Sequence, residues 1–295
     1  MISQIKLAFW LLVASSATGK VLAFSTSTTT RLHTERVLDM PVISVTANTN
    51  SRTHSALTRL QASTNTDMVD VDTDALTKYA TSGIIQMSSF FALFTAMDSL
   101  VSVSGIEVPF VANCAFFYLC SLRSRIFNPL SNDRPNVASV NDESITIRPS
   151  WTPPGVVFPI MWLLIIGPLR AYSASLVYMS TDSYASVAIL SFFLHLSIGD
   201  IWNTINNVEK RYGPATIGVF LVWCSAANAA FQYSQVDQFA GELLGLTLVW
   251  LTVAAALIAS TWKLNPDETT GELTPLYPVK GDVETTFAWF GGKES

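Results

Sequence analysis

Six apolar segments separated by short polar stretches constrain the fold of this chain more than any other feature. The last four each approach the ~20 residues that a helix needs to cross ~30 Å of hydrocarbon. The loops between these four are short, so neighbouring helices are expected to pack antiparallel as a bundle. The sequence therefore predicts an all-α integral membrane protein. The six segments cover about residues 84–103, 108–122, 157–179, 184–206, 214–234 and 239–262.

Composition agrees with a membrane location and excludes other classes of protein. Hydrophobic residues make up 49% of the chain and charged residues only 13%, whereas an average soluble domain is about a quarter charged. The net charge of −5 comes without any Lys/Arg cluster long enough to follow nucleic-acid phosphates. Cys114, Cys120 and Cys224 lie in or beside apolar runs without the spacing of metal ligands. We therefore expect neither nucleic-acid binding nor a metal site.

The first 65 or so residues have the composition of targeting segments rather than of a folded domain. Lys6 precedes a short apolar run and small residues end at Ala23, which indicates a secretory signal peptide over residues 1–23. Residues 24–65 are rich in Ser and Thr and poor in acids, as in an organelle transit peptide. This order resembles the bipartite presequence of plastids acquired by secondary endosymbiosis, which predicts a plastid membrane. The alternative is an endomembrane or secreted protein with a disordered N-terminal segment.

The charges of the loops support the boundaries of the predicted helices. If helices alternate from residue 108 onward, one side of the membrane receives the Lys and Arg residues of the loops, and the turns at 180–183 and 235–238 have none. Such a bias follows the positive-inside tendency. We predict a transmembrane domain over 106–266 and a polar C-terminal tail over 267–295. The segment at 80–105, which contains Asp98, is an additional apolar helix that either spans the membrane or lies at its surface.

The stretch from Trp151 to Trp162 has the pattern of a helix that enters a bilayer. Pro153 and Pro154 precede a long apolar run, and prolines fit the first turn of a helix because N–H groups lack partners there. An indole at Trp151 fits the boundary between water and hydrocarbon. Trp162 lies about three turns further in, at hydrocarbon depth.

Several polar side chains lie within the apolar segments, where they usually face the interior of a bundle. Arg170 and His195 lie at nearly equal depth, and Asp200 lies about one turn nearer the basic face. We expect an interhelical pair between Arg170 and Asp200, with a ligand contact of Arg170 as the alternative. His195 is interpreted as a hydrogen-bonded core histidine rather than a metal or haem ligand. It shares a helix stripe with Gly199 and Trp202, and Gly199 is expected to allow close approach of a backbone or ligand.

Tryptophans recur in a fixed order along the last four apolar segments. The motifs are Trp151-Thr-Pro-Pro-Gly with Phe158 and Trp162, Leu194 with Trp202, Gly213, Trp250-Leu251, and Trp262-Lys263-Leu264-Asn265-Pro266. This set resembles the tryptophan-rich sensory protein family, also called the translocator protein or peripheral benzodiazepine-receptor family (TspO/MBR). The resemblance covers about residues 106–266 and needs almost no gaps through the last four helices.

The resemblance implies five transmembrane helices around a pocket that binds porphyrins, haem and sterols, in a family that is often dimeric. A flat apolar macrocycle suits a concave site walled by indoles, and Arg170 is interpreted as a partner for a ligand carboxylate. His195 stands where the family usually has Gln. Ile258 and Ala259 replace its usual Asn-Tyr pair, which argues against sterol binding by that route. The ligand-binding residues carried over by position are Trp151, Phe158, Trp162, His195, Trp202, Trp223 and Trp250, to which Arg170 is added.

The sequence thus favours a tetrapyrrole-binding membrane protein that acts as a carrier, scavenger or sensor in a plastid membrane. The expected ligand is a porphyrin, haem, a chlorophyll intermediate or another flat apolar molecule. No cofactor is required, and a homodimer is consistent with the family. One alternative is an enzyme that degrades a porphyrin in light, although the sequence offers no nucleophile–base arrangement and no catalytic residue. Another is a light-harvesting or other structural subunit, which the single intramembrane His disfavours.

Overall fold

The computed structural model of the chain describes residues 70–131, 146–267, 270–281 and 283–289. Within these ranges every regular element is helical, apart from two isolated β-bridges. The prediction of an all-α fold is therefore confirmed. The predicted signal and transit segments, 1–23 and 24–65, lie outside the described residues.

Five helices of the described chain are long and apolar enough to cross a membrane, which confirms the predicted bundle. Their membership differs from the prediction. α3 (Thr73–Ser104) qualifies because it extends to 32 residues, about 48 Å. α4 (Phe110–Arg123) has only 14 residues, about 21 Å, and ends in the 3₁₀ turn η1 (Ser124–Phe127). The other four long helices cover Val157–Thr181, Val187–Val208, Tyr212–Val236 and Gln238–Leu264.

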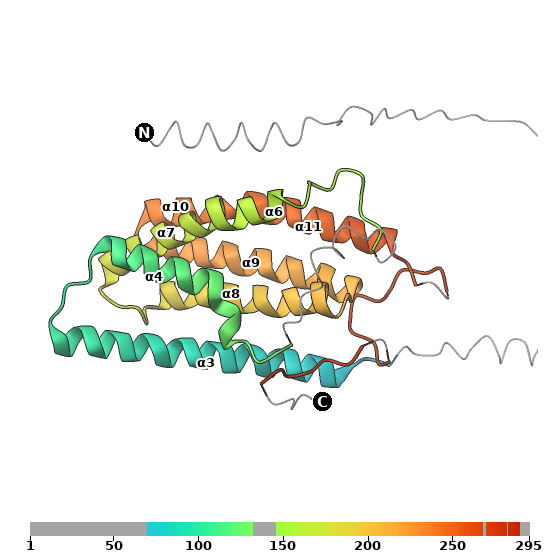
Figure 1. Cartoon of the computed structure of the whole chain (residues 1–295), viewed down its shortest axis with the longest axis horizontal. Coiled ribbons are helices and arrows are strands. Elements are labelled where there is room, and N and C mark those ends of the chain that lie inside the picture. Colours follow the sequence, from blue (N-terminus) through green and yellow to red (C-terminus); the bar gives the residue numbers. More distant parts are fainter. Residues whose placement is uncertain (1–69, 132–145, 268–269, 282, 290–295) are drawn as a thin grey trace, which may run out of the picture. The chain divides into compact units, whose positions relative to one another are not determined.

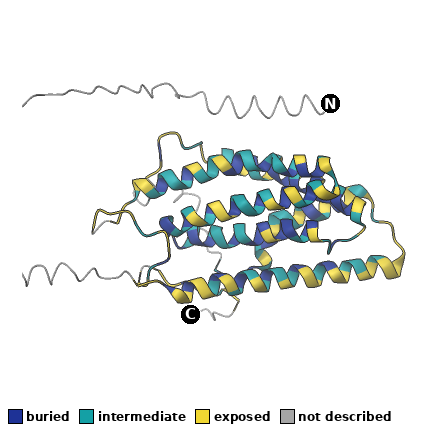
Figure 2. Ribbon diagram, turned by 180° about the vertical axis from the view of Figure 1, so that it is seen from behind, coloured by how far each residue is buried: buried dark blue, intermediate teal, exposed yellow. Residues whose placement is uncertain are grey.

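α9 (Tyr212–Val236) lies at the centre of the bundle (Figure 1). α8 (Val187–Asn203), α10 (Gln238–Gly245) and α11 (Thr247–Leu264) pack along it, whereas α4 packs along α7 (Gly167–Thr181). α3 packs on α8, and Figure 2 shows long exposed stretches on its other faces. α3 is thus an outer helix of the bundle, and its exposed apolar surface fits contact with lipid.

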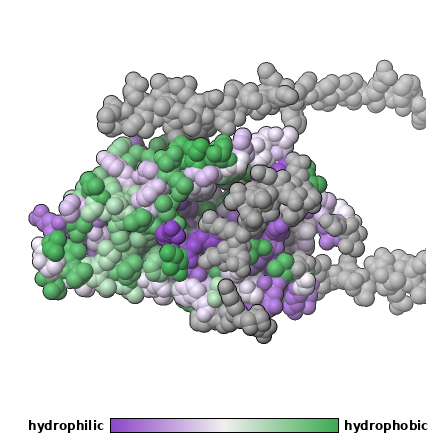
Figure 3. All heavy atoms as spheres, in the orientation of Figure 1, coloured by the Kyte–Doolittle hydropathy of each residue, from purple (hydrophilic) through white to green (hydrophobic). Residues whose placement is uncertain are grey.

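The Lys and Arg residues of the turns between the long helices lie at one end of the bundle. The α8–α9 turn and the end of α11 hold Lys210, Arg211 and Lys263, and we call this the basic end. At the other end, the acidic end, the α7–α8 and α9–α10 turns hold Asp182 and Asp237 and no Lys or Arg. Figure 3 shows hydrophobic side chains over much of the visible surface, with polar ones concentrated towards the basic end. The separation agrees with the sides that the loop charges predicted.

Asp98 fixes α3 to the bundle near the acidic end. Its carboxylate accepts hydrogen bonds from the hydroxyl of Ser183 at 2.7 Å and from the backbone N–H groups of Tyr184 and Ala185 at 2.7 and 3.0 Å. These three donors belong to the turn between α7 and α8. A charge in an apolar helix is costly unless it is hydrogen-bonded, and here the turn supplies the donors.

A buried polar seam joins the middle of α3 to α8 and to the segment after α4. The Nε2 atom of Gln86 donates to the Asp200 carboxylate at 2.8 Å and to the Ser124 carbonyl at 3.0 Å. Its Oε1 atom accepts from Asn128 at 3.0 Å, and the hydroxyl of Ser82 donates to Asn128 at 2.9 Å. Non-helical backbone at membrane depth requires such partners. The contacts join the middle of α3 to the interior of the bundle.

The C-terminal tail pairs with the start of α3 at the basic end. Val71 and Val279 form an antiparallel β-bridge. The Asp72 carboxylate caps α3 by accepting from the N–H of Ala75 at 2.9 Å, and it pairs with Arg211 at 2.8 Å. Burial would raise the pKa of Asp72, but the Ala75 N–H and the Arg211 guanidinium outweigh it and hold that pKa below its ordinary value. The basic end is therefore closed by polar contacts between distant parts of the chain.

Candidate ligand-binding site

Trp162 joins two apolar clusters in the interior of the bundle. One cluster contains Met161, Ile166 and Trp250, and the other contains Val222, Ala226 and Leu251. The ring of Trp162 packs against both, while Trp202 and Trp223 pack against the second. Four predicted site tryptophans from four separate helical segments are therefore brought together. We call the four side chains of Trp162, Trp202, Trp223 and Trp250 together the indole slot.

Hydrogen bonds fix two of these indoles. The Nε1–H of Trp202 donates to the carbonyl of Ala215 in α9 at 3.0 Å. The Nε1–H of Trp223 donates to the hydroxyl of Thr252 in α11 at 3.0 Å. Gly218 makes room for the first indole, because a Cβ atom there would lie 2.9 Å from Cδ1 of Trp202. The rings are thus oriented by neighbouring helices, and a half-buried indole with a satisfied N–H presents its apolar faces.

Two wide π-helical turns lie next to the slot. η2 (Ile160–Ile166) contains Trp162, and η3 (Thr204–Val208) begins two residues after Trp202. In η2 the N–H of Gly167 bonds the carbonyl of Trp162, and the hydroxyl of Tyr118 in α4 donates to the carbonyl of Leu163 at 2.9 Å. π-Turns are rare and occur often at functional sites, because they rotate the side chains that follow relative to a regular helix.

Open space lies beside Gly199, on the stripe of α8 between His195 and Trp202. A Cβ atom built at Gly199 would meet no heavy atom within 4 Å. The side chains one turn away on this stripe bond to α9, so the space faces the interior of the bundle. No backbone of the described residues therefore approaches Gly199 closely, and the alternative, close approach of a ligand, stays a prediction.

Arg170 pairs with His195, and the expected pair with Asp200 does not form. The guanidinium NH2 group of Arg170 lies 2.7 Å from Nε2 of His195. Its Cζ atom lies 5.1 Å from the ring centroid of Trp162 and 5.8 Å from that of Phe192. The Asp200 carboxylate instead accepts a hydrogen bond from the side-chain amide of Gln86 in α3. In the described residues no group of three His, Cys, Asp or Glu side chains is arranged to hold a metal ion.

Phe158 and Trp151, the two remaining predicted site residues, lie in different surroundings. Phe158 packs edge-on against Trp250, with ring centroids 5.9 Å apart, and so extends the wall of the slot. Trp151 lies in the loop before α6 (Val157–Pro159) and is 47% exposed. It is not part of the two clusters that Trp162 joins. Its exposure agrees with the predicted anchor at the membrane boundary.

Sequence reasoning missed Tyr233, which lies beside Arg170. Tyr233 is completely buried, packs on Phe192 with ring centroids 6.1 Å apart, and interacts electrostatically with the guanidinium. The signal available in the sequence was weak, because a Tyr near the end of an apolar helix is typical of the membrane interface.

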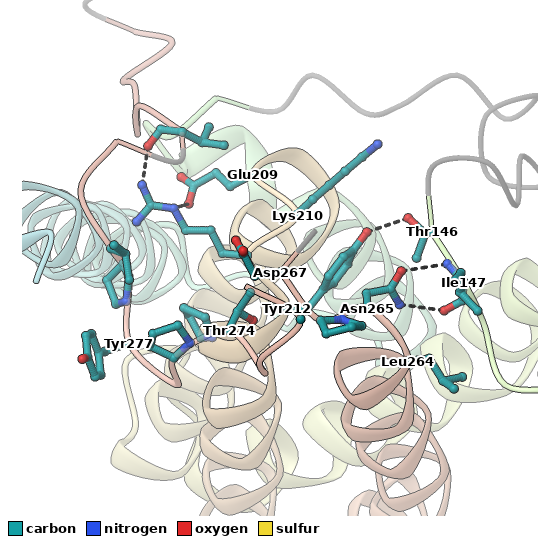
Figure 4. A pocket seen from close by; sticks show the side chains of 18 residues that line it. Thr146, Ile147, Glu209, Lys210, Tyr212, Leu264, Asn265, Asp267, Thr274 and Tyr277 are labelled. Carbon is teal, nitrogen blue, oxygen red and sulfur yellow. Dashed lines mark hydrogen bonds and ion pairs between the residues drawn. The ribbon is translucent and has the colours of Figure 1, made fainter. Parts of the chain in front are cut away.

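A cavity of about 660 Å³ lies at the basic end, between the start of α9, the end of α11 and the C-terminal tail (Figure 4). The hydroxyls of Tyr212 and Thr146 lie 2.5 Å apart. Asn265 exchanges two hydrogen bonds with the backbone of Ile147, at 2.9 and 2.8 Å. These contacts hold the segment before Trp151 against α9 and α11. None of the predicted site residues lines this cavity, which is separate from the indole slot.

One protein family and several known proteins are similar to this chain. The TspO/MBR family model matches residues 116–263. Protein CrtK of Rhodobacter capsulatus is 27% identical over 122 residues, which cover 41% of this chain and 76% of the relative. The tryptophan-rich sensory protein of Cereibacter sphaeroides is 28% identical over 118 residues, 40% of this chain and 73% of the relative. The translocator protein of Sus scrofa is 25% identical over 121 residues, 40% of this chain and 71% of the relative.

The matched region begins within α4 and ends in α11. It includes four of the five long helices and all of the indole slot, whereas α3 and the C-terminal tail lie outside it. Because the family model covers half of the sequence, this chain belongs to the TspO/MBR family.

Proposed function

We propose that this protein binds a tetrapyrrole in the indole slot and acts as a carrier, scavenger or sensor in a plastid membrane. The convergence of four indoles from four helical segments, next to the open space at Gly199, carries the proposal. A porphyrin is a flat and largely apolar disc, and aromatic walls bind such discs through stacked and edge-on contacts. The names of two relatives, a sensory protein and a translocator, accord with sensing or transport.

Binding is tested by titrating the purified chain in detergent with protoporphyrin while tryptophan fluorescence is recorded. We expect saturable quenching at micromolar concentrations and about a tenfold weaker affinity for Trp202→Leu. Trp289→Leu is the matched control, because Trp289 is an exposed indole in the C-terminal tail. Quenching that does not saturate, or that both variants weaken equally, contradicts a binding site in the slot.

The same complex separates carriage from breakdown. A carrier or sensor releases intact porphyrin after illumination, whereas a degrading enzyme consumes it with turnover. Extraction and quantification of the pigment before and after exposure to light distinguishes the two.

The plastid location is a separate part of the proposal and rests on residues 1–65. Fusion of this segment to a fluorescent protein, expressed in an alga with a complex plastid, is expected to label the plastid. Retention in the endoplasmic reticulum or secretion would contradict it. Neither result bears on ligand binding in the slot.

A further inference from the structure

Arg170 brings a positive charge next to the indole slot. Asp200 acts on this charge electrostatically, but no carboxylate of the described residues lies within 4 Å of the guanidinium. Arg170 is 6% exposed, and it forms no ion pair with any of the described residues. Nε2 of His195 accepts from Arg170 at 2.7 Å, so the imidazole proton lies on Nδ1. Nδ1 faces the carbonyl of Val222 at 3.2 Å and the hydroxyl of Ser225 at 3.1 Å. The imidazole is therefore neutral, and the pair retains the full charge of the guanidinium.

Three buried donors of the described residues lack acceptors: one on Arg170 itself, one on Tyr233, and one on Trp250, whose cluster packs against Trp162. Within the described part of the chain, Nε of Arg170, the hydroxyl of Tyr233 and Nε1 of Trp250 have no hydrogen-bond partner. They come from α7, α9 and α11. An unpaired buried donor costs about 1–3 kcal/mol, so native proteins rarely leave several of them in one region. What the region lacks is an acceptor, and next to a guanidinium the favoured acceptor is an anion.

Arg170 and Tyr233 lie next to the indole slot. The guanidinium of Arg170 lies over the ring of Trp162, at 5.1 Å from its centroid, and over the ring of Phe192, at 5.8 Å. Tyr233 packs on the same Phe192 ring and interacts electrostatically with Arg170. A disc seated against Trp162 therefore has its edge within reach of Arg170 and Tyr233.

Resting on the proposed function, we propose that Arg170 and Tyr233 form an anion subsite that holds a carboxylate of the bound tetrapyrrole. An ionised carboxylate has about four acceptor positions, and it balances a charge that is costly in hydrocarbon. The ligand class is therefore a tetrapyrrole with at least one free carboxylate. Because Nε2 of His195 is occupied by Arg170, this carboxylate rather than an axial bond from His195 to a metal holds the ligand.

The test compares protoporphyrin with its dimethyl ester, which has the same ring and no ionised carboxylate. Affinities are measured for the wild-type chain, Arg170→Gln, Arg170→Lys and Tyr233→Phe. In the wild type we expect the free acid to bind about tenfold or more tightly than the ester. Arg170→Gln removes this preference, and Tyr233→Phe reduces it. Arg170→Lys retains the positive charge and is expected to keep a preference for the acid. It is the control that separates loss of the charge from a folding defect in Arg170→Gln.

The outcomes separate this inference from the proposed function. Tight and equal binding of acid and ester by the wild type overturns the anion subsite and leaves the slot as a tetrapyrrole site. Failure of both to bind overturns the proposed function itself. A preference for the acid that persists in Arg170→Gln places the carboxylate elsewhere and overturns the subsite.

Two further measurements distinguish other occupants. If chloride fills the subsite, its replacement by gluconate changes the melting temperature of the ligand-free wild type but not of Arg170→Gln, and acid and ester bind alike. That result overturns the assignment to a ligand carboxylate. Ferric haem is expected to give the same absorption spectrum in the wild type and in His195→Ala. A histidine-ligated spectrum that disappears in the variant contradicts the occupied Nε2 atom.

Discussion

The side-chain amide of Gln86 in α3 donates to the carboxylate of Asp200 in α8 at 2.8 Å, inside the bundle. Gln86 lies outside the region that the family model matches, and Asp200 lies within it. The hydrogen bond therefore joins α3 to the part of the chain that the family model matches. In surroundings of low polarity such a bond is costly to break, because both groups are then left without partners.

Gln86→Leu is expected to lower the free energy of unfolding by about 1–3 kcal/mol, because Asp200 and Asn128 each lose a buried partner. The change is measured as a fall in melting temperature in detergent. Ile84→Ala is the control, because Ile84 lies on the same helix and is largely exposed. An equal effect of the two variants would show that the polar seam does not hold α3.

Gly199 and Gly218 are expected to respond in opposite ways to substitution by Ala. The methyl group at 199 meets open space, and Ala is favoured over Gly within a helix by about 1 kcal/mol, so Gly199→Ala raises the melting temperature. Gly218→Ala forces the indole of Trp202 to move, which costs about 1–3 kcal/mol. It also weakens porphyrin binding. A stabilising Gly218→Ala would disprove the close contact with Trp202.

The tail is expected to detach when Gly213 is enlarged. A Cβ atom at Gly213 would overlap the carbonyl of Pro275, so Gly213→Ala displaces the tail from the start of α9. Trypsin should then cleave faster after Lys280, which in the native chain pairs with Asp70 at 3.0 Å. Gly245→Ala serves as the control because its added methyl group meets no atom within 4 Å. Unchanged cleavage in Gly213→Ala contradicts the docked tail.

Acid is expected to weaken the contact of Asp72 with Arg211. The pKa of Asp72 in the folded chain lies below its ordinary value, so the stabilisation is complete above the unfolded pKa of about 3.9. It is lost as the pH falls through the folded pKa. Asp72→Asn can still cap α3 but has no charge, so the gap in melting temperature between it and the wild type should narrow from pH 7 to pH 3. A gap independent of pH would contradict this role.

The sequence predicted the helical bundle and most of the indole slot for a simple physical reason. Span length and side-chain polarity are set by the membrane, so apolar runs reveal helices directly. The order of tryptophans placed Trp162 and Trp202 in one interior. The partner of Arg170 was predicted incorrectly, because helical rise gives depth but not direction. His195 and Asp200 are five residues apart, about 140° around the helix axis, so they cannot both face α7.

Voids and extra helices are harder to infer than spans. The sequence does not show that Gly218 is in close contact with a neighbour whereas Gly199 has open space beside it. That difference depends on how the surrounding helices pack. α3 did offer a usable signal. Ser82, Gln86 and Phe90 recur at intervals of four residues and are all buried. Ser82 and Gln86 thus share a stripe with the buried aromatic residue Phe90, a pattern typical of a helix face that packs on a bundle.

The bridge between Val71 and Val279 has a consequence for how the protein is made. All five long helices lie between these two residues in the sequence, so the β-bridge cannot form while the ribosome is still translating them. Insertion into the bilayer must therefore precede closure of the basic end. A chain that ends before the tail would expose Glu209 and its partner Arg211, which are buried in the full chain. We expect proteases to cleave such a chain at the basic end faster than the full chain.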